Sequence, residues 1–183
     1  MQDKPIDLSL CMVTYKAKDM LEECLASIYE QQHNVSFETI LVDNESNDGT
    51  AEMVREKYPQ VVYIQNDDNV GFQKATNQAL SAASGRYLMW LNNDTVVHAG
   101  AFDALMDFGE THPEAGIFGP KVLNRDGTLQ KQCRRGDPTP WSVLSYFSGL
   151  WKLFPKSKFF SGYLLSYRDE QETMEVDACS GAA

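Results

Sequence analysis

The chain has no run of 18 consecutive apolar residues, so its sequence predicts no helix that could span a membrane. Its first residues, Met-Gln-Asp-Lys-Pro, lack the basic and apolar regions of a secretory signal peptide. The four cysteines are scattered without C-x-x-C spacing, which argues against a zinc site and favours reduced thiols. These absences predict a cytoplasmic protein. Its 183 residues and 43% hydrophobic content allow one globular domain with a sizeable core.

Two glycine-rich phosphate-binding motifs are also missing. Neither G-x-G-x-x-G nor G-x-x-x-x-G-K-[ST] occurs, so a Rossmann dehydrogenase and a P-loop nucleotidase both lack their central signature. The net charge of −10 argues against general nucleic-acid binding. Residues 131–168 are an exception to this acidity, because they hold seven basic residues against one acidic residue. This basic island requires a function of its own.

Apolar strands alternate with amphipathic helices along most of the chain. The predicted strands cover residues 7–15, 37–42, 61–65, 87–91 and 116–123, and the predicted helices cover residues 19–31, 50–58, 71–83 and 99–111. Asn124-Arg125-Asp126-Gly127 predicts a hairpin-type turn. This alternation predicts an α/β fold with a mostly parallel, Rossmann-like sheet flanked by helices.

Polar side chains follow two of the predicted strands. Asn92-Asn93-Asp94-Thr95 follows the fourth strand, and Asp43 ends the second. Open α/β sheets bind ligands at the carboxyl ends of their strands, so Asp94 is a candidate ligand for Mg²⁺ or Mn²⁺ shared with substrate phosphates. Asp43 is expected at an exposed strand edge, where it accepts hydrogen bonds from a nucleobase or ribose, or else serves as an ordinary turn residue. Asp48-Gly49-Thr50 predicts a tight turn and a helix N-cap.

Asn69 and Gly71 precede the third predicted helix, and Asn77 lies further along it. The N-terminus of a helix favours phosphate through its free N–H groups and its dipole. Asn77 is expected to face inward beside the strand ends. One glycine before a helix is nevertheless a much weaker indication than a P-loop.

Residues 141–165 hold eight of the twenty aromatic residues. One face of a predicted helix there carries Val143, Phe147, Leu150 and Phe154, with Trp151 alongside and Lys152, Lys156 and Lys158 near its end. Aromatic residues beside lysines suit a membrane interface or a lipid-linked acceptor. The alternative is an apolar face that packs against a further part of the protein. Residues 175–183 begin like a strand entering a glycine turn, so we expect the sequence to stop inside its domain.

Five motifs occur in a fixed order. They are Val13-Thr14-Tyr15, Val42-Asp43-Asn44-x-Ser46-x-Asp48-Gly49-Thr50, Asn69-x-Gly71-Phe72-x-x-Ala75-x-Asn77, Leu91-Asn92-Asn93-Asp94 and Val176-Asp177-x-x-Ser180-Gly181-Ala182. This series closely resembles family 2 inverting glycosyltransferases of the GT-A fold, and within them the bacterial rhamnosyltransferase-like branch that builds cell-surface polysaccharide. The resemblance runs from about residue 7 to the last residue.

The resemblance implies a role for each site residue. The nucleotide-binding set would be Thr14, Tyr15, Asp43, Asn69, Gly71, Asn77 and Asn93, with Asp43 on a uracil or thymine base. Asp94 would be the last acid of the D-x-D motif and would hold the metal, although Asn92 replaces the first acid. The catalytic base would follow Ala183. If it lies inside the chain instead, Asp126 and Asp177 are the carboxylates to consider.

The resemblance also implies a reaction and its partners. A sugar would pass with inversion from a UDP- or dTDP-sugar to a polysaccharide or lipid-linked acceptor, at the inner face of the membrane, with residues 141–165 as a peripheral membrane contact. Residues 1–130 would bind the nucleotide sugar, and residues 131–183 would begin the acceptor side. One alternative is a sugar-phosphate nucleotidyltransferase, but Tyr15-Lys16-Ala17-Lys18 lacks the glycine that such enzymes have after strand one. Another alternative is a non-catalytic nucleotide-sugar-binding module.

Overall fold

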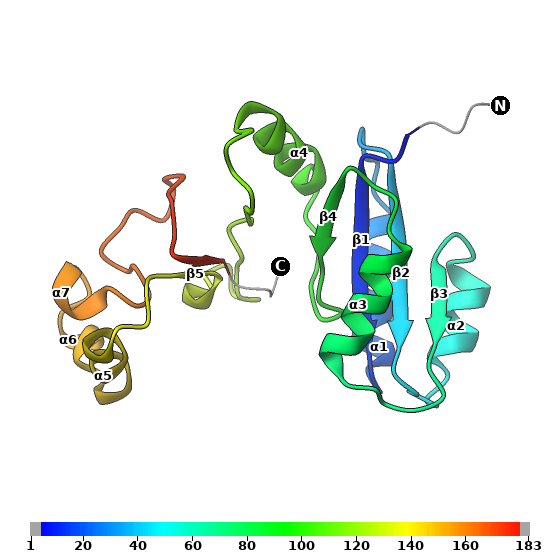
Figure 1. Cartoon of the computed structure of the whole chain (residues 1–183), viewed down its shortest axis with the longest axis horizontal. Coiled ribbons are helices and arrows are strands. Elements are labelled where there is room, and N and C mark those ends of the chain that lie inside the picture. Colours follow the sequence, from blue (N-terminus) through cyan, green and yellow to red (C-terminus); the bar gives the residue numbers. More distant parts are fainter. Residues whose placement is uncertain (1–4, 180–183) are drawn as a thin grey trace. The chain divides into compact units, whose positions relative to one another are not determined.

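The computed structural model describes residues 5–179, and the chain divides into two compact units, Met1–His112 and Pro113–Ala183. The first unit contains the sheet and the second contains short helices and a small hairpin (Figure 1). The division after His112 differs from the boundary predicted after residue 130.

A four-stranded parallel sheet forms the centre of the first unit. Its strands are β1 (Leu8–Thr14), β2 (Phe37–Asp43), β3 (Val62–Gln65) and β4 (Tyr87–Trp90), in the spatial order β3-β2-β1-β4. All three neighbouring pairs are parallel, and β1 pairs with β2 from Leu8↔Phe37 to Thr14↔Asp43. The parallel α/β sheet predicted from the alternation of strands and helices is therefore confirmed.

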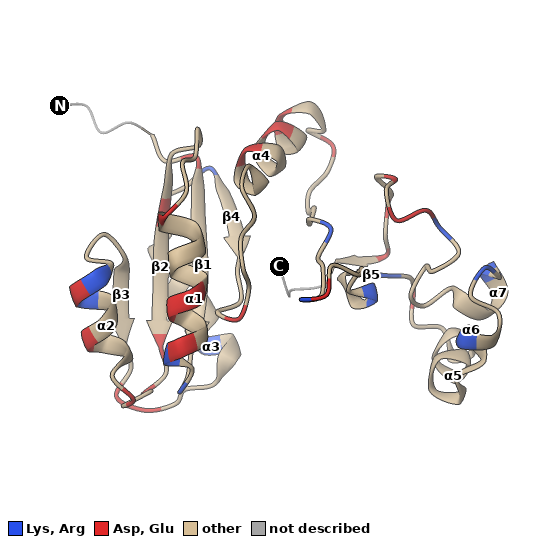
Figure 2. Cartoon of the chain, turned by 180° about the vertical axis from the view of Figure 1, so that it is seen from behind, with Lys and Arg blue, Asp and Glu red and all other residues tan. Residues whose placement is uncertain are grey.

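Helices cover both faces of this sheet (Figures 1 and 2). They are α1 (Lys18–Tyr29), α2 (Thr50–Lys57), α3 (Phe72–Ala82) and α4 (Ala101–Thr111). Successive side chains of a strand point to opposite faces, so Leu10 and Met12 join one core with α1, α2 and α4, whereas Cys11 joins a second core with α3. Burial on both faces explains why β1, at the centre of the sheet, is a nearly continuous apolar run.

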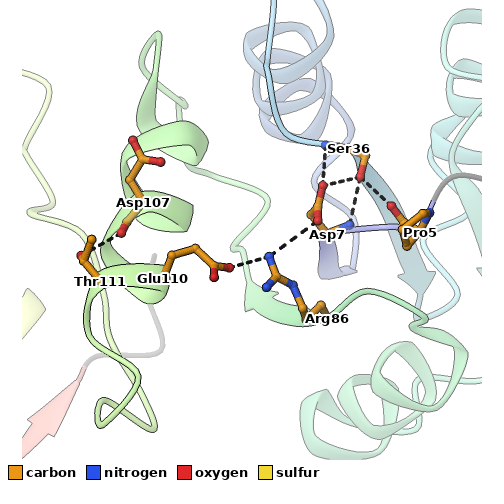
Figure 3. A network of polar contacts seen from close by, with 7 residues as sticks. All are labelled: Pro5, Asp7, Ser36, Arg86, Asp107, Glu110 and Thr111. Carbon is orange, nitrogen blue, oxygen red and sulfur yellow. Dashed lines mark hydrogen bonds and ion pairs between the residues drawn. The ribbon is translucent and has the colours of Figure 1, made fainter.

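The amino-terminal edge of the sheet is held by a polar network (Figure 3). Arg86, just before β4, pairs with Glu110 of α4 and lies 3.7 Å from Asp7, just before β1. The Asp7 carboxylate also accepts a hydrogen bond of 2.6 Å from the Ser36 hydroxyl. The Arg86 and Glu110 side chains are about half exposed, at 55% and 49%, so solvent screens this pair and it contributes little to stability. The network fixes α4 at the edge opposite the strand ends that carry the predicted site residues.

The second unit is built from short elements. They are a 3₁₀ turn (Lys131–Cys133), β5 (Arg134–Arg135), α5 (Pro140–Ser148), α6 (Leu150–Leu153), α7 (Lys158–Ser161) and β6 (Ala178–Cys179). The hydroxyl of Thr139 caps α5 by accepting from the backbone N–H of Ser142, with Pro140 at the first helical position. Within residues 5–179, no helix is both long enough and apolar enough to cross a bilayer.

Two predictions for the second unit are wrong. Residues 116–123 form no strand, and only an isolated bridge joins Leu123 to Leu129 around the predicted turn. Ile117 is 81% exposed. Apart from that bridge, no segment of the described chain pairs with residues 116–123, so these residues form no part of a sheet. Val143, Phe147, Leu150 and Phe154 do not share the face of one helix, because Gly149 adopts φ +77° and ends α5, so Phe147 and Leu150 lie in different helices.

Two other predictions for this unit are confirmed. Gly127 adopts φ +81° and its N–H donates to the Asn124 carbonyl oxygen at 2.9 Å, as the hairpin-type turn requires. The strand expected near the end of the chain is β6, which pairs antiparallel with β5. The glycine turn expected after it lies outside the described residues.

Candidate functional site

The strand order reverses between β1 and β4, and this reversal is where open α/β sheets bind ligands. Thr14 ends β1, and its side chain is 1% exposed. Asn93 follows β4, and its side-chain amide donates a hydrogen bond of 3.0 Å to the Thr14 hydroxyl. The structure thus brings two predicted site residues together across the reversal point.

Tyr15 is the next residue along the chain, and 44% of it is exposed. The Lys16 ammonium lies 5.0 Å from the centre of its ring, within the range of a cation–π contact. An exposed aromatic ring beside a ligand-binding edge is suited to stacking against a planar base.

Asp43 is not at an exposed strand edge, as the sequence predicted, because it is 1% exposed. Its position is covered because β2 lies between β1 and β3. One carboxylate oxygen accepts from the Ser46 backbone N–H at 2.8 Å, and the other accepts from the Tyr63 hydroxyl of β3. Burial and the Asp43 hydrogen bond raise the pKa of Tyr63, so this phenol stays a donor at neutral pH. Each carboxylate oxygen can still accept a second hydrogen bond from a ligand.

The loops after β1 and β2 contain three non-glycine residues in the left-handed region. These are Lys16 at φ +50°, Glu45 at φ +64° and Asn47 at φ +50°. The loops bond to each other, since the Lys16 N–H donates to the Ser46 hydroxyl at 3.0 Å. Such strain persists where the surroundings fix the backbone, and it is common at ligand sites. Lysine and glutamate rarely adopt this conformation, so no residue type in these loops indicated it.

Asp48 has the structural role that the sequence predicted. Its carboxylate accepts from the Thr50 N–H and hydroxyl at the start of α2 and from the Lys18 N–H at 3.3 Å. Burial opposes its ionisation, but these hydrogen bonds prevail and lower the pKa of Asp48. Asp48 therefore joins the two strained loops to the helices that follow them.

The loop of residues 91–97 carries Asp94, the predicted metal ligand, and this loop contacts α1. Ser27 accepts from the Val97 N–H at 2.9 Å, and the Gln31 amide donates to the Val97 carbonyl oxygen at 2.7 Å. Cys24, one turn earlier on the same helix face, lies 3.7 Å from the Asn92 carbonyl oxygen. Burial raises the pKa of Cys24 to about 12, so the thiol is neutral.

Asp94 itself is exposed, and within residues 5–179 its carboxylate has no hydrogen-bonding or ionic partner. The described residues hold no group of three His, Cys, Asp or Glu side chains arranged for a metal ion. A single free carboxylate with amide oxygens nearby nevertheless fits Mg²⁺ or Mn²⁺, because these ions are commonly bound by one or two carboxylates together with substrate phosphates.

The residues of the third motif, Asn69 to Asn77, do not all face the predicted site. Asn69 accepts from the Gly71 N–H at 3.0 Å, and Gly71 adopts φ +84° at the start of α3. Asn77 does not face inward as predicted, because Ala75 and Ala79 form the buried face of α3 and Asn77 lies two residues from each. It is exposed and lines an open groove along the outside of α3.

A network of side-chain amides that does not include Asn77 joins the ends of β2 and β3 to α3. The Asn66 amide after β3 donates to Asn44 after β2 and to Gln78 of α3, both at 2.9 Å. Gln78 donates back to Asn66 at 2.8 Å. This network and Tyr63 were missed from the sequence, because only the fold brings their partners together.

The two candidate bases inside the chain have local partners in the second unit. Asp126 accepts from the Thr128 N–H and hydroxyl, at 2.9 and 2.6 Å, within the hairpin. Asp177 accepts from the Asp137 N–H at 2.8 Å beside the β5–β6 pair. Both arrangements are typical of structural turn carboxylates.

Comparisons with known proteins bear on the family and the fold of this chain. The sequence profile of glycosyl transferase family 2 matches residues 9–171. The N-acetylglucosaminyl-diphospho-decaprenol L-rhamnosyltransferase of Mycobacterium tuberculosis is 29% identical over 140 residues, which cover 70% of this chain and 45% of the relative. The chain spans about half the length of the curated relatives that it matches.

Two solved structures share the fold of the first unit. Staphylococcus aureus TarS 1-349 in complex with UDP-GlcNAc has a TM-score of 0.55 and 22% identity, over 66% of this chain and 38% of that one. The mannosyltransferase PcManGT from Pyrobaculum calidifontis, in complex with GDP-Man and Mn²⁺, has a TM-score of 0.50 and 26% identity, over 66% of this chain and 35% of that one. The GT-A fold predicted from the sequence is thereby confirmed.

Proposed function

The chain belongs to glycosyl transferase family 2, and from this premise we propose that it is the nucleotide-sugar-binding portion of an inverting glycosyltransferase. The donor is a UDP- or dTDP-sugar, and the acceptor is a polysaccharide or lipid-linked glycan of the bacterial cell surface. The observation that carries this proposal is the meeting of Thr14, Asn93 and Asp94 at the strand reversal, with Asp94 free to bind a ligand.

Each side chain at this edge has a task in the proposal. Tyr15 stacks on the nucleobase, and Asp43 accepts from the base or ribose through its remaining lone pairs. Thr14 and Asn93 orient the ribose, while Asn69 and the N–H groups that follow Gly71 lie at the start of α3, where a helix favours phosphate. Asn77 is not included, because its side chain is on the exposed face of α3.

Asp94 would hold Mg²⁺ or Mn²⁺ against the diphosphate. When bound, such an ion neutralises the charge that develops on the leaving diphosphate. The Mn²⁺ in the mannosyltransferase complex supports this part of the proposal. Two hydrogen bonds between α1 and the backbone of Val97 hold the end of the loop of residues 91–97 that carries Asp94.

The acceptor hydroxyl must lose a proton as it attacks the anomeric carbon. Asp126 and Asp177 are each engaged in a local turn, which disfavours both as the base. We place the base in the part of the relatives' length that this chain does not span.

The second unit is proposed to contact the membrane that carries the acceptor. Its short helices expose several large apolar side chains, namely Leu144 (56%), Phe147 (81%), Leu153 (72%) and Phe159 (63%). Lysines of α6 and α7 lie among them (Figure 2). Exposed aromatic residues with lysines suit the surface of an anionic bilayer, here its cytoplasmic face. The rhamnosyltransferase relative is named for an acceptor linked to decaprenol, which supports this location.

A calorimetric titration tests the proposed site. UDP and dTDP should bind the 183-residue chain, and Mn²⁺ should strengthen the binding. Asp94→Asn should remove the metal-dependent gain, whereas Asp107→Asn, at an exposed acid of α4, should keep it. A metal-dependent gain that survives Asp94→Asn would contradict the assignment of Asp94, and the absence of any nucleotide binding would contradict the function.

A further inference from the structure

The second unit contains a cavity of about 750 Å³ that the proposed nucleotide site does not use. Its lining includes two buried leucines, Leu129 and Leu164, which are 8% and 3% exposed. One wall is formed by Tyr146 and Trp151, whose rings are stacked at an interplanar angle of 15° with centroids 6.1 Å apart. The volume lies within the usual range for small-molecule sites, roughly 300–1,000 Å³.

The rim of this cavity is polar, and four of its side chains make no hydrogen bond within the described residues. Gln132, Gln171, Glu170 and Lys121 line it, and none of these side chains has a hydrogen-bonding partner among the described residues. Other polar side chains of the same unit are engaged. Ser145, for example, donates to the Phe160 carbonyl oxygen at 2.6 Å. Free polar groups beside two aromatic rings and buried leucines can hydrogen-bond a polar small molecule that enters the cavity.

The rim chemistry indicates the class of ligand. Glutamine amides both donate and accept, and Glu170 accepts, which matches the hydroxyl groups of a saccharide. The ring faces of Tyr146 and Trp151 offer an apolar surface for the C–H face of a sugar. Lys131, held 5.1 Å from the centre of the Trp151 ring, and Lys121 provide point charges suited to phosphate.

We propose that this cavity binds the sugar-phosphate head group of the acceptor. Its role as an acceptor site rests on the proposed function, but binding of a sugar phosphate does not. The lining contains two lysines and one carboxylate, so a neutral saccharide should bind more weakly than its phosphate. The exposed side chains of Phe147 and Leu153, in the same helices as Tyr146 and Trp151, would then face the lipid to which the head group is attached.

Nuclear magnetic resonance on the ¹⁵N-labelled chain tests this assignment, because the three tryptophans give three indole signals. N-Acetylglucosamine 1-phosphate should shift the Trp151 indole signal, identified with Trp151→Phe, and leave those of Trp90 and Trp141 unchanged. N-Acetylglucosamine alone should bind about tenfold more weakly, and inorganic phosphate and uridine monophosphate should shift Trp151 little.

Variants and a second ligand complete the test. Gln132→Ala and Lys131→Met should each weaken binding about tenfold, whereas Lys156→Met, an exposed lysine outside the lining, should not. An unshifted Trp151 signal, or equal shifts with inorganic phosphate or uridine monophosphate, would overturn the proposal. UDP titrated into the same samples separates the two hypotheses. A Trp151 response without UDP binding would refute the proposed function alone, and UDP binding without that response would refute the cavity assignment alone.

Discussion

The Tyr63 hydroxyl donates a hydrogen bond to the Asp43 carboxylate, so a residue of β3 fixes the acid that ends β2. The second donor, the Ser46 N–H, comes from the loop after β2. Asp43 is thus oriented by the strand beside it and by its own loop before any ligand arrives. Pre-orientation of this kind lowers the entropic cost of binding.

Asp43→Asn should lower both stability and nucleotide affinity. Asparagine would direct an amide N–H₂ toward the Ser46 N–H, so that two donors face each other, or toward the Tyr63 hydroxyl, which would then have to accept and turn its own hydrogen away. We expect a loss of about 1–3 kcal/mol in the free energy of unfolding, measured with urea, and weaker UDP binding in calorimetry. Tyr63→Phe is the matched control, because it removes one donor but leaves the carboxylate in place. It should lower stability while keeping UDP affinity within about threefold. Equal UDP affinity in the wild type and Asp43→Asn would make Asp43 a structural turn residue.

Ser27→Ala should reduce the metal-dependent part of nucleotide binding, although Ser27 is not a metal ligand. Its hydroxyl accepts the Val97 N–H, and without it the loop that carries Asp94 loses one of its contacts with α1. We expect a smaller gain of UDP affinity on adding Mn²⁺ and unchanged affinity without metal, both measured by calorimetry. Ser81→Ala, which removes a hydroxyl bonded to the Asn77 carbonyl oxygen on α3, should leave both values unchanged. An equal loss with and without metal would indicate general destabilisation instead.

Lys16→Gly should stabilise the protein. Lys16 adopts φ +50°, and the left-handed region costs a non-glycine residue about 1–2 kcal/mol. Glycine avoids this cost but loses about 0.5–1 kcal/mol of chain entropy, which leaves a net gain of about 0.5 kcal/mol in urea denaturation. Lys74→Gly, inside α3, should have the opposite sign and lose about 1 kcal/mol. Destabilisation by Lys16→Gly would mean that the lysine side chain contributes more through its contact with Tyr15 than the strain costs.

Phe147→Ser should weaken binding to vesicles that contain phosphatidylglycerol, measured by co-sedimentation. Raising the salt concentration should weaken the binding of the wild type as well, because salt screens the attraction of the lysines to anionic lipid. Ile117→Ser is a matched control, since Ile117 and Phe147 are both 81% exposed but only Phe147 lies in the helices with the lysines. Wild-type binding that is absent at low salt or insensitive to salt would favour packing of these helices against another part of the protein.

The sequence was sufficient for features that depend on local periodicity. The four parallel strands and the polar residues at their ends, Thr14, Asp43 and Asp94, follow from apolar runs that stop at polar turns. Asn77 was misplaced because its spacing from Gly71 does not decide which face of α3 is buried, and the buried Ala75 and Ala79 turn it outward. Tyr63 lies in the short strand predicted for residues 61–65, and no role was predicted for it. Its role depends on a pairing of β2 with β3 that no local pattern encodes.

The buried thiol of Cys24 can report on motion of the loop of residues 91–97, which carries Asp94. Cys24 lies beneath Asn92, and its pKa of about 12 keeps it unreactive while the loop rests on α1. A thiol reagent can therefore reach Cys24 only when the loop of residues 91–97 moves away from α1. The exposed Cys179 reacts without such an opening and marks the rate of the reagent itself. The ratio of the two labelling rates measures how often the loop opens. A bound nucleotide and metal that hold the loop closed would slow the labelling of Cys24 and leave that of Cys179 unchanged.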